Sequence, residues 1–159
     1  MLKRYFVLGL LVTLFLSACE EKAPPKMKPL EYIQSKSISD LIANDLIQND
    51  VKDLYKHLDV GFQMVVKDEK DVAMVLDKMY AESGRPLEFD FKISQTGVRK
   101  DGSWERPSRT FWYTAKTTKF DKGKYFLKVE IVPAYGGSPL DTSGFGLLSF
   151  KDKVPSYLQ

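Results

Sequence analysis

Residues 87–94 read Leu-Glu-Phe-Asp-Phe-Lys-Ile-Ser, and this stretch decides the fold class. Apolar and polar side chains alternate along it, which predicts a half-buried β-strand. The expected inner face of this strand consists of Leu87, Phe89, Phe91 and Ile93. Upstream of position 87 the apolar residues recur at helical spacing, and downstream they alternate again. Helices followed by strands predict the α+β class.

The region before this strand predicts two or three helices. Residues 38–47 carry apolar side chains at spacings of three and four, as in an amphipathic helix. This stripe comprises Ile38, Leu41, Ile42, Leu46 and Ile47. Asn49-Asp50 predicts a break with a new N-cap. Two further helical segments are expected over residues 51–65 and 68–83, the second capped by Asp68 and ended by a Gly-x-Pro sequence.

The region after residue 94 predicts three more strands, at residues 109–118, 125–131 and 144–151. A turn sequence at residues 100–103 precedes the first of these strands, and a second turn sequence at residues 121–123 separates it from the next. Short turns between consecutive strands are typical of an antiparallel meander. We therefore expect two or three N-terminal helices packed on a curved four-stranded antiparallel sheet.

The N-terminus has the features of a secretory signal. Lys3 and Arg4 precede an uncharged apolar run of 12 residues, Tyr5 to Leu16. As a helix this run spans only ~18 Å, whereas a bilayer core is ~30 Å thick. The run ends in Leu16-Ser17-Ala18-Cys19, which resembles the lipobox of bacterial lipoproteins. The alternatives are an ordinary signal peptide in which the cysteine stands by chance, or a buried N-terminal helix.

The lipobox resemblance implies a lipid anchor. In that class of protein a diacylglyceryl group is attached to the cysteine thiol, the chain is cleaved before the cysteine, and the new amine is acylated. Cleavage here would fall between Ala18 and Cys19. We therefore expect residues 1–18 to be a signal peptide, residues 19–34 a tether rich in proline and charge, and residues 35–159 a single domain.

Composition limits the partners of the mature chain. The whole chain has 24 basic and 21 acidic residues, and removal of Lys3 and Arg4 leaves 22 − 21 = +1. A near-neutral domain gives no reason to expect nucleic acid. One cysteine and one histidine exclude a disulfide framework and the common zinc sites.

Glu20 replaces the Asp that commonly retains lipoproteins in the inner membrane, so we expect a periplasm-facing protein, with the outer membrane favoured.

A second resemblance covers about residues 35–151. Helices followed by a four-stranded sheet, behind a lipobox, are similar to bacterial lipoproteins of the nuclear transport factor 2-like, or cystatin-like, superfamily. Residues 44–58, residues 62–66 and the hairpin of residues 114–126 carry this resemblance. It implies a cone-shaped α+β domain. The superfamily includes isomerases, dehydratases, transport subunits and non-catalytic modules, so the resemblance does not determine an activity.

Two residues invite a catalytic interpretation. His57, the only histidine, could be a general acid or base oriented by Asp53 or Asp59, or it could lie on a solvated helix face, which is the interpretation adopted. Ketosteroid-isomerase-like members of the superfamily use an Asp as general base, and Asp90 is the candidate for that role here. However, Asp90 alternates with apolar residues and is expected to point to solvent. No catalytic residue and no metal or cofactor other than the lipid are expected.

The remaining candidate is a partner surface. Trp112 and Phe126 are expected on the sheet face opposite the helices, flanked by Lys116 and Lys128, which predicts an exposed aromatic and basic surface. Alternatively one ring face packs in the core and the lysines solvate the sheet edge, which is the interpretation adopted. We expect a non-catalytic, membrane-anchored lipoprotein that binds a protein or cell-envelope partner, as an accessory or immunity-type module. The alternatives are an enzyme or small-molecule carrier with a pocket under the sheet, and a structural role at the cell wall.

Overall fold

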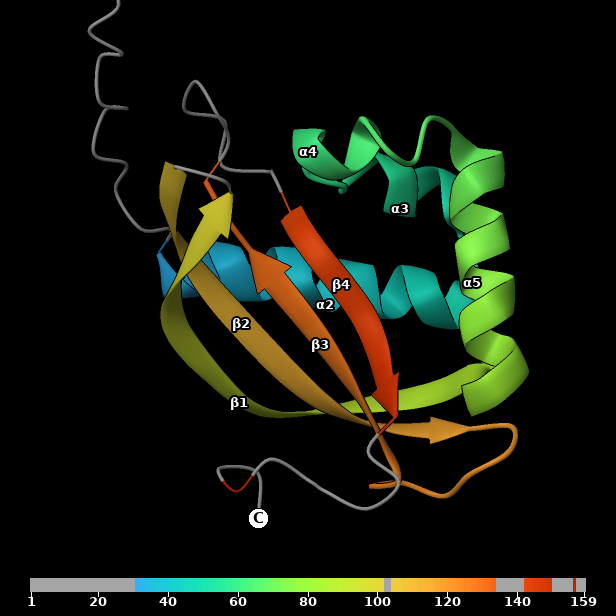
Figure 1. Ribbon diagram of the computed structural model, residues 1–159. Helices are drawn as coiled ribbons and strands as arrows, with labels where there is room; N and C mark the ends of the chain where they lie inside the picture. The colour runs from blue at the N-terminus through green and yellow to red at the C-terminus, as the bar shows by residue number, and fades with distance from the viewer. Residues whose placement is uncertain (1–30, 102–103, 134–141, 150–155, 157–159) are drawn as a thin grey trace, which may run out of the picture.

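In the computed structural model of the chain (Figure 1), which describes residues 31–101, 104–133, 142–149 and 156, helices precede strands. The helices are α2 (Tyr32–Gln48), α3 (Val51–Lys56), α4 (Val60–Gln63) and α5 (Glu69–Ser83). The strands are β1 (Pro86–Asp101), β2 (Trp104–Thr117), β3 (Tyr125–Ile131) and β4 (Thr142–Ser149). They pair antiparallel in the order β1-β2-β3-β4. The predicted α+β class, with helices first and an antiparallel sheet after them, is confirmed.

Helix α2 begins earlier than the expected domain boundary. Its N-cap is Glu31, so residues 32–34, which we expected in the tether, are helical. The helix ends at Asn49, whose φ of 58° lies in the left-handed region. Asp50 then caps α3, because its side chain accepts the backbone N–H of Asp53 at 3.1 Å. The break predicted at Asn49-Asp50 is therefore confirmed.

The second helical segment is shorter than predicted. We expected one helix over residues 51–65, but α3 ends at Lys56 and a separate short helix, α4, begins at Val60. The carbonyl of Asp59 accepts the backbone N–H groups of Phe62 and Gln63, which starts the new turn. The carboxylate of Asp59 binds Arg106 of the sheet, as described below. This tertiary contact lies between the end of α3 and the start of α4, where the helix is interrupted.

Both ends of α5 follow local rules. The Asp68 side chain accepts the backbone N–H groups of Lys70 and Asp71 at 2.9 and 3.1 Å, which caps the helix as predicted. Gly84 ends it with a φ of 76°. A Cβ at that position would lie 2.7 Å from the hydroxyl oxygen of Thr118, so both the backbone conformation and the close approach require glycine.

Strand β1 departs from the alternation that predicts it. It pairs with β2 from Pro86 to Asp101, but the register shifts between Phe91 and Ile93. Leu87 is 51% exposed and Phe91 39%, whereas Phe89 packs against the core. The ring of Phe91 still contacts the core rings of Phe111 and Tyr113, whereas Ile93 pairs with Trp112, whose side chain lies on the opposite face. The expectation that all four apolar residues form the inner face is therefore wrong. β1 is an edge strand with one neighbour, and the register shift changes which side chains face the helices.

The core fills the space between the helices and the sheet. Helix α2 crosses one face of the sheet, α5 stands beside β4, and α3 and α4 lie beyond one end of the strands (Figure 1). The core side chains from the helices include Ile38, Ile42, Leu46, Leu54 and Leu76, and those from the strands include Phe111, Leu127 and Val129. Two residues of the predicted α2 stripe, Leu41 and Ile47, are instead 48% and 40% exposed. None of the described helices is long and apolar enough to cross a membrane.

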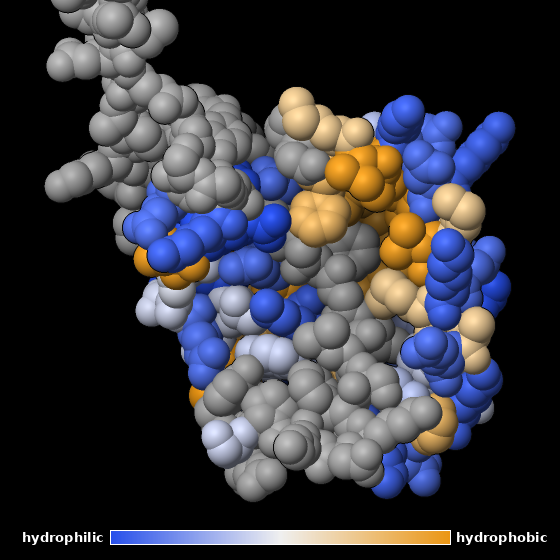
Figure 2. Space-filling model, in the orientation of Figure 1, coloured by the Kyte–Doolittle hydropathy of each residue, from blue (hydrophilic) through white to orange (hydrophobic). Residues whose placement is uncertain are grey.

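Exposed apolar side chains gather at one place on the face shown in Figure 2. They lie over α4 and the turn that joins it to α5, where Met64 and Val65 are each 77% exposed. Hydrophilic side chains border this cluster on the α5 side in this view.

Candidate functional site

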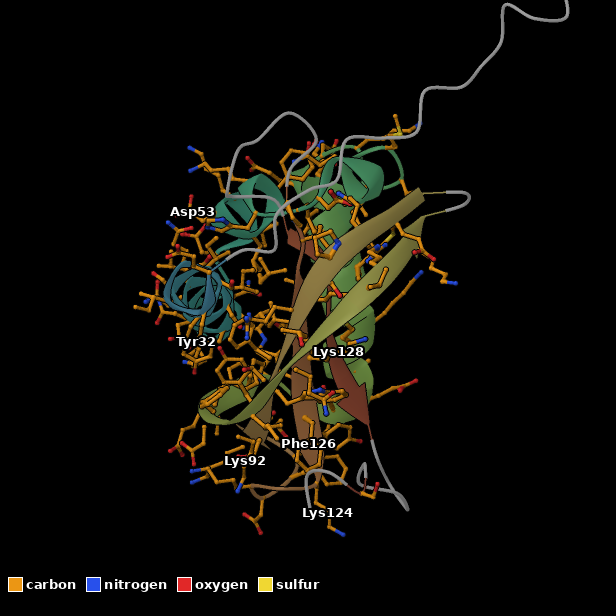
Figure 3. All side chains as sticks on the ribbon, turned by 90° about the vertical axis from the view of Figure 1, so that its left-hand side faces the viewer. Tyr32, Asp53, Lys92, Lys124, Phe126 and Lys128 are labelled. Carbon is orange, nitrogen blue, oxygen red and sulfur yellow. The ribbon has the colours of Figure 1, made fainter. Side chains whose placement is uncertain are left out.

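The predicted aromatic surface is not exposed. Trp112 and Phe126 are only 5% and 4% exposed, although they lie on the strand face opposite the core residues Phe111 and Leu127. Both faces of these central strands are therefore covered, and the two rings contribute to packing instead of presenting an open apolar patch. Their burial fits the interpretation adopted, in which the rings pack, and not the exposed aromatic patch. Lys116 is exposed, and Lys128 is half-buried on the same strand as Phe126 (Figure 3).

The residues of the lipid-attachment site, Ala18 and Cys19, lie outside the described residues. The same holds for most of the tether, of which only residues 31–34 are described. The lipid anchor therefore stays a prediction from the sequence.

His57 meets a carboxylate that the sequence spacing did not indicate. Its Nε2 atom lies 3.9 Å from Oδ2 of Asp45 on α2, and the two side chains are 21% and 10% exposed. The expected partners are engaged elsewhere, since Asp53 forms an ion pair with Lys56 and Asp59 binds the sheet. Burial raises the pKa of the Asp45 carboxyl above its usual value, and the nearby His57 opposes that shift. The pair connects α2 to the end of α3.

Asp59 and Arg106 form a buried ion pair that joins the α3–α4 junction to β2. Both guanidinium terminal nitrogens donate to the carboxylate, at 3.0 and 2.8 Å, and the side chains are 1% and 3% exposed. Arg106 also donates to the carbonyl of Pro133 at 3.4 Å. This two-point geometry orients the carboxylate and fixes the position of α4. Sequence analysis missed the pair because its members are 47 positions apart.

A second polar network ties α2 to the middle of the sheet. The buried hydroxyl of Tyr113 donates to Oδ1 of Asp40 at 2.8 Å and shares a 2.7 Å hydrogen bond with the hydroxyl of Ser39. Burial is the main reason why the pKa of Tyr113 is raised. Nζ of Lys36 donates to both oxygens of Asp40, at 2.6 and 2.7 Å, and lies 4.5 Å from the ring centroid of Phe91. These contacts hold the charged side chains of α2 in fixed positions.

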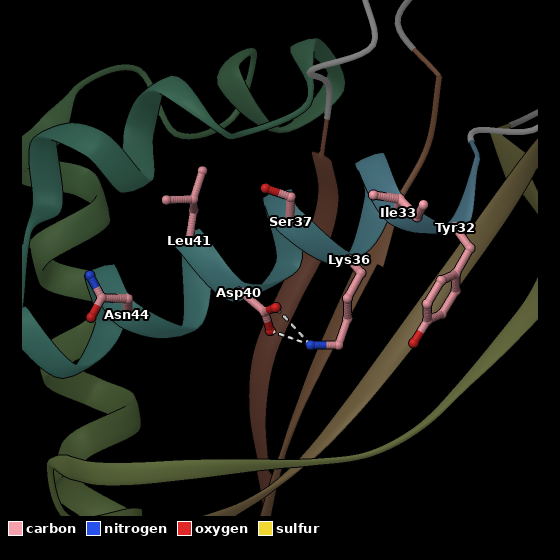
Figure 4. A pocket seen from close by; sticks show the side chains of 7 residues that line it. All are labelled: Tyr32, Ile33, Lys36, Ser37, Asp40, Leu41 and Asn44. Carbon is pink, nitrogen blue, oxygen red and sulfur yellow. Dashed lines mark hydrogen bonds and ion pairs between the residues drawn. The ribbon is translucent and has the colours of Figure 1, made fainter.

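An open hollow of about 500 Å³ lies beside this network, along the outer side of α2 (Figure 4). The described residues that line it all come from α2 and are Tyr32, Ile33, Lys36, Ser37, Asp40, Leu41 and Asn44. Ile33 and Leu41 are 79% and 48% exposed, and the Lys36–Asp40 ion pair lies between them. Apolar side chains beside a fixed ion pair suit binding of another surface. The sequence did contain a signal for this apolar surface, because Ile33 and Leu41 are eight positions apart, a spacing that turns both towards the same side of a helix.

The two residues that invited a catalytic interpretation, Asp90 and His57, lie apart from the hollow on α2. Asp90 is exposed and forms an ion pair with Lys122, so the expectation that it points away from the helices is confirmed. His57 and Asp45 do not line the hollow on α2. Within the described ranges, no group of three or more His, Cys, Asp or Glu residues could hold a metal ion.

Comparison with known proteins does not help to interpret this site. Comparison with known protein families, with curated proteins and with solved structures finds no match for this chain. The lipobox-like sequence and the order of helices and strands therefore stay resemblances, and the site has to be interpreted from its own chemistry.

Proposed function

We propose that this protein is a non-catalytic lipoprotein of the bacterial cell envelope, whose domain binds a protein or cell-envelope partner. The observation that carries the proposal is the position of the only cysteine. Cys19 follows Leu-Ser-Ala at the end of a 12-residue apolar run, and charged and proline-rich residues come directly after it. Acyl chains on Cys19 would anchor the protein, since two or three chains give stable membrane attachment.

The described domain is compatible with this arrangement. Its first helix begins at Tyr32, directly after the segment Glu20 to Leu30, which has three prolines and little apolar character. We propose that this segment is the tether, that the domain faces the periplasm, and that Glu20 favours the outer membrane. The finer fold proposed for the domain is the curved four-stranded sheet of nuclear transport factor 2-like proteins.

The outer side of α2 is the best candidate for the partner surface. It replaces the aromatic surface first expected at Trp112 and Phe126, which is buried. On α2, Ile33 and Leu41 expose apolar area next to charges that the domain already holds in place. Because the Lys36–Asp40 pair is already ordered, these charges lose little conformational entropy on binding, which favours recognition.

A pocket under the sheet, the alternative function, is less well supported. Leu127 and Val129 are fully buried, and Phe89 packs against the same core cluster. These side chains occupy the space in which the substrate of an enzyme or carrier of this type would lie. The polar groups that converge there, Ser39 and Tyr113, are hydrogen-bonded to one another and are engaged in packing.

Labelling with an analogue of palmitate tests the anchor. The wild-type chain should incorporate the label and partition with membranes, and Cys19→Ala should do neither. Ser17→Ala is the matched control, because it keeps a small residue in the cleavage region and should remain labelled. An unlabelled wild-type protein that still begins at Met1 contradicts the proposal.

Site-specific cross-linking tests the partner surface. A photoreactive residue at Ser37, inside the hollow, should give a discrete adduct in membranes, and Leu41→Glu should abolish that adduct. Met74, which is 52% exposed on α5, provides the control position. Equal adducts from Ser37 and Met74, or an adduct that survives Leu41→Glu, would exclude α2 as the binding surface.

A further inference from the structure

The turn between α4 and α5 presents two consecutive apolar side chains to solvent. Met64 and Val65 are each 77% exposed, whereas Phe62, two positions before Met64, and Val66, directly after Val65, pack against the core. Apolar atoms gather over this turn in Figure 2. Exposed turns usually carry polar residues and glycine, so two large apolar residues at a turn tip point to a surface that contacts something apolar.

The exposure is built into the fold. Nε2 of Gln63 donates to the carbonyls of Tyr55 and Leu58, at 3.3 and 3.1 Å. On the other side of the tip, the hydroxyl of Tyr55 donates to the carbonyl of Lys67 at 2.8 Å. The backbone N–H groups of residues 65 and 66 both bond to the carbonyl of Phe62, at 2.9 and 2.7 Å. The turn is thus fixed from both sides while its two apolar side chains remain outside.

The start of the domain and this turn are connected through one end of β2. The guanidinium of Arg109 lies 5.4 Å from the ring centroid of Tyr32, the first residue of α2. Arg106, three residues along the same strand and ~10 Å away, binds Asp59, the residue just before α4. A short stretch of β2 therefore links the point where the tether joins the domain to the helix that leads into the apolar turn.

The tether is long enough to let this turn reach a membrane. Eleven residues, Glu20 to Leu30, separate the acylation site from the first described residue, Glu31, which is 12 positions after Cys19. Fully extended, the stretch from Cys19 to Glu31 spans at most ~43 Å. A domain held within that distance of a bilayer has a high effective concentration at the bilayer surface, which favours even a weak contact of two side chains.

We propose that Met64 and Val65 insert into the outer part of the bilayer that carries the acyl anchor, so that the domain lies against the membrane. This inference rests on the lipid anchor of the proposed function. Residues 67–71 carry two basic and three acidic side chains, a net charge of 2 − 3 = −1, so no basic excess adds to the contact, which is apolar and fits a largely zwitterionic phospholipid surface. Raising the salt concentration therefore leaves the contact unchanged.

The test uses the lipidated mature protein with Val65→Cys, labelled with a polarity-sensitive fluorophore, in phosphatidylethanolamine-rich vesicles. Acylated Cys19 has no free thiol, so position 65 alone reacts. The matched control is Met74→Cys on α5, also at an exposed apolar position. We expect blue-shifted emission and quenching by brominated acyl chains at position 65 only, both unchanged by salt, and loss of the quenching at position 65 when Met64 is replaced by Ser.

The outcomes separate the two proposals. If the protein fails to float with the vesicles, or if Cys19 also takes the label, the anchor and the insertion are both overturned. If the protein floats but position 65 is quenched no more than position 74, only the insertion is overturned. A blue shift that disappears on dilution of protein among vesicles, without quenching by brominated chains, means that a second copy of this chain covers the turn.

Discussion

Replacing Asp59 with Asn removes the negative charge from the most deeply buried ion pair described in this domain. The change keeps the size of the side chain but leaves the guanidinium of Arg106 buried without its carboxylate. The side chains are 1% and 3% exposed, and the two hydrogen bonds of 3.0 and 2.8 Å both involve charged groups. Breaking a buried pair of this type on one side costs about 3–5 kcal/mol.

That loss is large relative to the stability of a small domain. Folded domains are stable by roughly 5–15 kcal/mol, so Asp59→Asn should remove a substantial fraction of the free energy of unfolding. For a domain of this size each kcal/mol corresponds to about 3–5 °C in Tm, which predicts a decrease of about 10–20 °C. Urea unfolding followed by far-ultraviolet circular dichroism measures the same loss directly as a lower midpoint.

Two comparisons make the result decisive. Glu105→Gln is the matched control, because Glu105 pairs with Lys100 at 3.2 Å while both side chains stay 60% and 75% exposed. That pair should contribute less than about 1 kcal/mol. Combining Asp59→Leu with Arg106→Met should recover part of the stability lost by Asp59→Leu alone, since no charge is left buried. If Asp59→Asn costs no more than Glu105→Gln, the buried pair does not fix α4 as described.

Four further predictions concern single residues. Burial raises the pKa of the Asp45 carboxyl, so the ionised group makes the folded domain less stable once the pH has risen through that pKa. Asp45→Asn should therefore increase the urea midpoint at pH 7, and this increase should disappear towards pH 4. The hydrogen bond from Lys56 lowers the pKa of Asp53, so Asp53→Asn should have the opposite sign at pH 7, and equal signs for the two variants would contradict this assignment. Tyr113→Phe removes a buried hydroxyl with two hydrogen bonds to α2 and should cost about 1–3 kcal/mol in urea unfolding, and an unchanged midpoint would mean that these bonds do not contribute. Gly84→Ala should lower Tm more than Gly123→Ala. Both glycines have a positive φ, but only at position 84 would the new Cβ lie 2.7 and 2.8 Å from other atoms. Equal decreases in Tm would mean that backbone strain is the whole effect.

The features that sequence analysis located correctly depend on neighbouring residues. Asp50 and Asp68 cap helices through their own backbone surroundings, and Gly84 ends α5 through its positive φ. The strand over residues 125–131 has the bounds that alternation predicts. In each case the free energy that sets the local conformation comes from contacts within a few positions, so the signal is present in the sequence.

The errors concern contacts between distant parts of the chain. Alternation placed Trp112 and Phe126 on the face opposite the helices, but it could not show that this face is also covered. Helical spacing suggested Asp53 as the partner of His57, whereas the corner between α2 and α3 brings Asp45 to it. Periodicity states which residues share a face, and it carries no information about what packs against that face.

The amino-acid sequence by itself determined the α+β class, the break at Asn49-Asp50, and the expectation of an acyl anchor at Cys19, because these depend on local conformational preference and on short motifs. Tertiary structure decided that Asp59 and Arg106 pair, that the rings of Trp112 and Phe126 are buried, and that the outer side of α2 and the turn at Met64 are exposed. Those features depend on which surfaces exclude water once distant segments meet. Burial is a property of the assembled fold, and the same side chain is stable inside or outside according to what covers it.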